Sequence, residues 1–109
     1  MQNKALVIID IQNDTTKNYK DIINNVNNVI GWATANNIHV IYIRHENLSA
    51  GTRTFKPNTI GSELATDLKI VSNNIFTAHH PSLISRLQLT MFQKYTFYIV
   101  ELTILILQR

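Results

Sequence analysis

The feature that most constrains the fold is a short, unbroken apolar run near the N-terminus that ends in an acid. Residues 5–9 read Ala-Leu-Val-Ile-Ile, and Asp10 follows directly. A run this short and rich in β-branched residues is typical of a strand buried on both faces of a parallel sheet. Ligands of open parallel α/β sheets bind at the carboxyl ends of the strands. Asp10 is therefore a candidate functional group, or else it caps a loop or pairs with Lys4 or Arg44.

A helix and a second strand follow this run. One apolar stripe recurs at helical spacing within residues 19–35, and asparagines occupy the opposite face. Asn36 and Asn37 are typical of a helix end. Residues 38–43 then read as a second strand that ends before Arg44, so the sequence predicts a βαβ unit with polar groups again gathered at a strand end.

The rest of the chain extends the same alternation. We expect a long loop containing Phe55 at residues 47–61. The other predicted elements are a short helix at 61–68 capped by Ser62, a strand at 75–77, a helix beginning at Pro81 and a fourth strand within 96–107. Together they predict a single domain over residues 1–109, an α/β fold in which helices cover a mostly parallel sheet as a three-layer α/β/α sandwich.

Composition excludes several classes of function. The net charge is +3, but the Lys and Arg residues are scattered, so we expect no nucleic-acid partner. With no cysteine in the chain, disulfides, Cys-zinc sites and thiol catalysis are excluded. The apolar tail at 97–107 is shorter than the roughly 20 residues that span a bilayer, and no signal peptide is visible, so we expect no membrane association and a cytoplasmic location.

Several motifs resemble a known family. Asp10, Gln12, Asn13 and Asp14 form D-x-Q-N-D after the first strand, and the segments at 40–47 (VIYIRHEN), 61–64 (GSEL) and 75–84 (IFTAHHPSLI) follow in order. This pattern resembles the isochorismatase-like hydrolases, also called the cysteine hydrolase family, which includes nicotinamidases. The resemblance covers most of residues 4–85, whereas residues 86–109 diverge, so we expect a C-terminally truncated form of the family fold, produced by a frameshift or premature stop in a longer gene.

The resemblance implies a catalytic set of Asp, Lys and Cys. Asp10 matches the family Asp, Ala78 occupies the Lys position, and the Cys is absent. His79 follows Ala78, but its side chain would face the other side of a continuing strand. Some isochorismatases work without the cysteine. The implied function is hydrolysis of a small-molecule amide (C–N) or vinyl-ether bond, impaired by the loss of two of the three groups.

Three further residues are candidates for substrate binding: Gln12, His45 and Phe55. Gln12, Asn13 and Asp14 could orient substrate or a loop, or they could be turn residues that satisfy their own backbone. His45 could be a solvated loop start, and Phe55 could tuck onto the core. Family nicotinamidases bind a metal through a D-x-H pattern, but Arg44-His45-Glu46 stands there. We therefore expect no metal and no cofactor.

A different class of function remains open. A truncated sheet leaves an apolar edge unpaired, which favours association, so we expect a homo-oligomer. The alternative function is a non-catalytic remnant that self-associates or binds a partner through this edge. A flavodoxin-like ligand-binding domain is a third option by fold analogy, although no Gly-rich phosphate loop is present.

Overall fold

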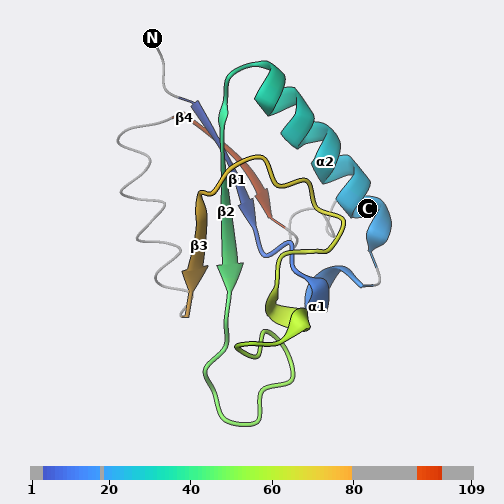
Figure 1. The fold of residues 1–109 in the computed structure, drawn as a ribbon, viewed down its shortest axis with the longest axis vertical. Coiled ribbons are helices and arrows are strands. Elements are labelled where there is room, and N and C mark those ends of the chain that lie inside the picture. Colours follow the sequence, from blue (N-terminus) through green and yellow to red (C-terminus); the bar gives the residue numbers. More distant parts are fainter. Residues whose placement is uncertain (1–3, 18, 80–95, 102–109) are drawn as a thin grey trace.

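The chain is built around a four-stranded parallel sheet (Figure 1). A computed structural model describes residues 4–17, 19–79 and 96–101. The strands are β1 (Lys4–Ile9), β2 (His39–His45), β3 (Ile75–Ala78) and β4 (Thr96–Glu101). Their order is β3-β2-β1-β4, and each pair is parallel. The predicted α/β fold class is confirmed.

One face of the sheet is covered by the long helix α2 (Lys20–Ala35) (Figure 1). Its buried residues are Ile22, Ile23, Val26, Ile30 and Ala33. They share a core with Leu6, Ile8, Val40 and Tyr42 of the central strands. The predicted stop is confirmed: the Asn36 N–H donates to the Trp32 and Ala33 carbonyls, and Asn37 has a φ of 56°. A left-handed residue after a helix is a common terminator, and asparagine adopts it readily.

The other face of the sheet is also buried. Its cluster consists of Ala5, Val7, Ile9, Ile41, Ile43 and Ala78. Those on β1 and β2 alternate with residues that face α2, as side chains do in a strand, and Ala78 joins them from β3. Burial on both faces was predicted for residues 5–9 and is confirmed. The predicted helix from Pro81, which would form the third layer, lies outside the described residues, as do residues 102–107 of the predicted fourth strand.

The helix expected at residues 61–68 is wrong. Only a 3₁₀ turn, η1 (Ile60–Ser62), forms, and Ser62 ends this turn instead of capping a helix. The following backbone pairs with the segment after β1: the Asn13 N–H donates to the Glu63 carbonyl and the Ala65 N–H donates to the Ile11 carbonyl. These groups bond to a distant segment, so they are not available for bonds within a helix.

The long loop predicted after the second strand is confirmed. Residues 47–59 contain no helix or strand. They lie beyond the carboxyl end of β2, at the edge of the sheet where the strands end (Figure 1). Within the described part of the chain, no helix has the length and apolar character that crossing a membrane requires.

Candidate active site

Four strand ends converge at one edge of the sheet. Asp10 follows β1, and the register pairs its neighbour Ile9 with Ile43 of β2 and with Glu101 of β4. His45 ends β2 and is in register with Ala78, the last residue of β3. Asp10, the predicted catalytic position, and His45, a predicted substrate-binding residue, thus lie at the ends of the two adjacent central strands.

The backbone fixes Asp10 in an uncommon conformation. Its φ is 60°, in the left-handed region. The Asp10 N–H donates to the Ile43 carbonyl at 3.0 Å, and the Asp10 carbonyl accepts from the Thr15 hydroxyl at 2.9 Å. Left-handed backbone in a residue other than glycine is often found at functional sites, where the surrounding structure holds it. Here two hydrogen bonds hold it.

The side chain of Asp10 lies in a partly desolvated environment. Its Oδ1 atom is buried and has no hydrogen-bond partner among the described residues. Burial raises the pKa of the Asp10 carboxyl above its ordinary value, the positive charge of His45 lowers it, and the negative charge of Glu101 raises it further. No ion pair of Asp10 with Lys4 or Arg44 is present in the described part of the chain. A carboxyl of this kind can both donate and accept a proton at moderate pH.

His45 is held at both its backbone and its ring. Its N–H donates to Oε1 of Gln12 at 2.8 Å, and its carbonyl accepts from Nε2 of Gln12 at 2.8 Å. The ring meets that of Phe55 edge to face, with centroids 5.4 Å apart. Phe55 thus brings the long loop over the His45 side of the site, and its covering of substrate stays a prediction.

Gln12 acts as a bridge beneath the site. Its side chain is fully buried, and besides His45 its Nε2 binds the Ser62 carbonyl at 2.6 Å. Both amide hydrogens are therefore used within the protein. Direct contact of Gln12 with a substrate remains a prediction, whereas these bonds support a role in positioning.

The next two motif residues hold the same loop. Asn13 donates to the Ile60 carbonyl and accepts from the Thr66 N–H, and Asp14 accepts from the Phe55 N–H at 2.8 Å. A Cβ at Gly61 would overlap the Asp14 carboxylate, so glycine allows this close approach. Of the alternatives considered for Gln12, Asn13 and Asp14, the described contacts favour holding a loop.

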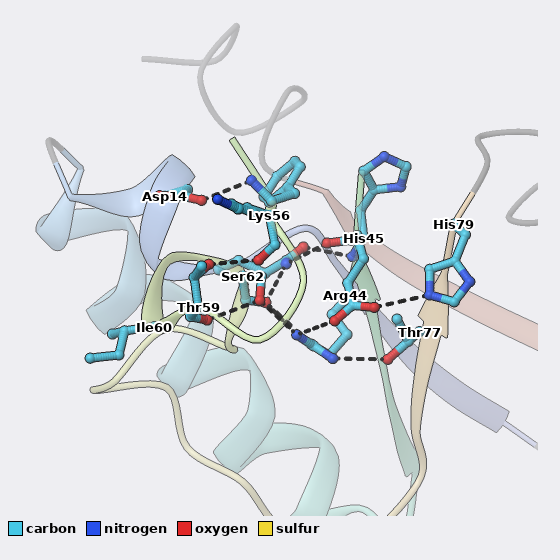
Figure 2. A network of polar contacts seen from close by, with 12 residues as sticks. Asp14, Arg44, His45, Lys56, Thr59, Ile60, Ser62, Thr77 and His79 are labelled. Atoms are coloured by element: carbon cyan, nitrogen blue, oxygen red, sulfur yellow. Dashed lines mark hydrogen bonds and ion pairs between the residues drawn. The ribbon is translucent and has the colours of Figure 1, made fainter. Parts of the chain in front are cut away.

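A second polar network lies on the other side of β2 (Figure 2). Arg44 donates to the Ser62 carbonyl and hydroxyl and to the Thr77 hydroxyl, and it pairs with Glu46 at 3.3 Å. His79 contacts Glu46 at 2.9 Å. These bonds occupy both Arg44 and His79 in joining β2, β3 and η1.

The remaining position of the implied catalytic set holds a methyl group. Ala78 is buried and cannot donate a hydrogen bond or carry charge. The described residues include no group of three or more His, Cys, Asp or Glu side chains that could hold a metal ion.

One residue at this edge was missed by the sequence analysis. Glu101 ends β4 in register with Ile9, and its charge acts on Asp10. The signal was an acid after the apolar run Tyr98-Ile99-Val100, the same pattern that identified Asp10.

Comparison with protein families identifies the chain. The model of the isochorismatase domain matches residues 4–94. The chain belongs to the isochorismatase family. A comparison with curated proteins found no match.

Solved structures share the isochorismatase-family fold. A protein described as a hydrolase of the isochorismatase family from Chromobacterium violaceum aligns with a TM-score of 0.63 and 14% identity, over 91% of this chain and 57% of its own. One described as an isochorismatase hydrolase from Oleispira antarctica gives 0.69 and 18%, over 91% and 60%. N-carbamoylsarcosine amidase from Thermoplasma acidophilum gives 0.59 and 14%, over 91% and 82%. The chain thus spans about three fifths of the first two relatives.

The bridge made by Gln12 predicts a specific loss of stability. We expect Gln12→Leu to lower the free energy of unfolding by about 2–4 kcal/mol. The substitution removes the hydrogen bonds of the Gln12 side chain to the His45 N–H, the His45 carbonyl and the Ser62 carbonyl. Urea unfolding followed by circular dichroism measures the change. Asn25→Leu on the exposed face of α2 is the matched control, and an equal loss in that variant would contradict the prediction.

The environment of Asp10 predicts that replacing this residue with asparagine stabilises the fold to an extent that depends on pH. Because the folded-state pKa of Asp10 is raised, its proton binds more tightly in the folded than in the unfolded chain. Its contribution to stability is therefore full below the unfolded pKa, near 3.8, and is lost as pH rises through the folded pKa. We expect Asp10→Asn to raise Tm by a few degrees at neutral pH, with the gain disappearing toward pH 3. Melting curves across pH measure it; a gain that grows on acidification would show the opposite linkage.

Proposed function

We propose that this chain is an isochorismatase-family hydrolase that cleaves a vinyl-ether or amide bond of a small molecule, with Asp10 as its proton-transfer residue. The observation that carries the proposal is the half-buried Asp10 carboxyl at the carboxyl edge of the sheet, whose buried Oδ1 has no hydrogen-bond partner among the described residues and whose pKa is raised. The lack of cysteine and the methyl group at Ala78 make the activity an impaired one. The activities in the relatives' names belong to longer chains, so the transfer of activity is itself part of the proposal.

Vinyl-ether hydrolysis suits the groups that remain. The protonated Asp10 carboxyl gives its proton to the terminal vinyl carbon, which leaves an oxygen-stabilised cation. Water adds to that cation and returns a proton to the Asp10 carboxylate, and the resulting hemiketal collapses to a ketone and an alcohol. This route needs one group that alternates between acid and base and no protein nucleophile.

Amide hydrolysis in the family pattern requires a nucleophile that this chain lacks. In the family pattern a thiolate attacks the carbonyl carbon, and no thiol exists in this chain. Asp10 would have to activate water directly, with no covalent intermediate to divide the barrier. We therefore place the vinyl ether ahead of the amide as the substrate class.

The catalytic proposal predicts that turnover falls when the titratable carboxyl of Asp10 is replaced by an amide. With isochorismate as the vinyl ether and nicotinamide as the amide, we expect Asp10→Asn to reduce turnover roughly 100-fold or more, because general acid–base catalysis contributes at least that much. Proton NMR follows each reaction, through the vinyl signals of isochorismate and the ring signals of nicotinamide. Asp67→Asn, an exposed carboxylate on the loop after η1, is the control. Turnover that persists in Asp10→Asn would disprove the role of Asp10. The absence of turnover in a folded wild-type chain would disprove the proposed hydrolase function.

A second function is favoured by the outer strands. Exposed apolar side chains lie on β3, with Ile75 at 41% and Phe76 at 47%, and on β4, with Tyr98 at 38%. These are the two outer strands of the described sheet. A non-catalytic chain that self-associates through such an edge is the alternative, and a homo-oligomer is compatible with either function.

This edge predicts concentration-dependent association. We expect light scattering to detect dimers or larger species for the wild-type chain at high concentration. Phe76→Asp should shift them toward monomer, because a charge on an outer strand opposes edge pairing. Leu48→Asp, in the exposed loop, should leave the size distribution unchanged. A wild-type chain that stays monomeric throughout would contradict association by this edge.

A further inference from the structure

We propose that His45 is the charge partner of Asp10, a positioning residue that holds a positive charge on the site from β2. Its catalytic consequence rests on the proposed function, whereas the pairing itself does not. The inference starts from the register of the sheet, which places His45 directly beside Ala78. Ala78 has no charged group, whereas His45 beside it can carry a positive charge.

His45 and Ala78 face the same side of the sheet as the end of β1. Ile41 and Ile43 share a buried cluster with Ile9 and Ala78. His45 is the next alternate residue of β2 after Ile43, so its side chain extends the same face. Arg44 points to the opposite face, toward Ser62 and Thr77, and Figure 2 shows the two side chains leaving β2 in opposite directions.

The ring of His45 is restrained before any ligand arrives. Gln12 fixes the backbone of His45 through two hydrogen bonds of 2.8 Å. Phe55 packs edge to face on the ring, and the Phe55 backbone is itself held by Asp14. A charged side chain whose position is fixed by its neighbours stabilises an opposite charge more effectively than a mobile one.

Among the described residues, two other basic side chains near this edge contact a different carboxylate. Arg44 pairs with Glu46 on the opposite face, and His79 contacts the same carboxylate. Lys56 is on the exposed loop. Among the described residues, the charged groups that act on Asp10 are His45 from β2, which lowers the pKa of Asp10, and Glu101 from β4, which raises it.

The chemical role follows from this balance. When Asp10 gives up its proton it becomes an anion in a partly desolvated place. A protonated His45 stabilises that anion and so makes Asp10 a stronger acid. The proton moves from Asp10 to the substrate and later returns from water, and the step uses no proton of His45.

The experiment measures the ionisation of Asp10 directly. The chain has four aspartates, so selective ¹³C labelling of the aspartate carboxyls, with Asp10→Asn to assign the signal, yields the pKa of Asp10 by NMR titration. We expect His45→Gln to shift this pKa upward and His45→Lys to bring it back to or below the wild-type value. His79→Gln is the matched control, since His79 contacts Glu46 and should leave the Asp10 titration unmoved. Circular dichroism verifies that each variant is folded.

Turnover separates this inference from the proposed function. In an active chain we expect His45→Gln to lose roughly tenfold or more in turnover and His45→Lys to recover most of it. An Asp10 titration unchanged in His45→Gln, or shifted equally in His79→Gln, would overturn the pairing even if the chain is active. A shifted titration in a chain without turnover would leave the pairing standing and remove the proposed function instead.

Discussion

The hydrogen bonds of the buried Gln12 amide are the interaction on which the rest of the site depends. One side chain joins the turn after β1, the end of β2 and the carbonyl of Ser62. Inside the protein such bonds are stronger than in water, and leaving their groups unpaired is costly. The positions of Asp10 and His45 relative to each other follow from this bridge, because it connects the segments that carry them.

The loop at residues 47–59 is held by the same motif. Asn13 and Asp14 bind backbone groups at Ile60, Thr66 and Phe55. With the bond of Gln12 to Ser62, three consecutive polar residues secure this loop and the segment around η1. The motif therefore divides its work. Asp10 provides the carboxyl proposed for proton transfer, and Gln12, Asn13 and Asp14 hold the neighbouring segments in place.

The fold was largely predictable because its signals are local. The apolar run of β1 and the apolar stripe of α2 each lie within one short continuous segment. Asp10 could be picked out as a candidate functional residue because ligands bind at strand ends. The helix predicted at 61–68 failed because its backbone bonds to residues 11–13, a pairing that no local pattern reveals. The bridge by Gln12 spans 33 and 50 residues of sequence, and for the same reason its role stayed open. Glu101 was missed because apolar residues follow it in the sequence, so it reads as an interruption of one apolar segment and not as an acid after a strand.

The left-handed backbone at Asp10 has a consequence for how relatives of this chain are compared. Side chains with a branched or bulky Cβ are strained at a φ of 60°, whereas glycine, asparagine and aspartate tolerate it. A lineage that had lost its chemistry would thus still be confined to a few residue types at this position. An aspartate retained there in a relative reports first on the shape of the turn. Residues free of such strain, at the ends of β2 and β4, are the better record of whether selection has kept the chemistry.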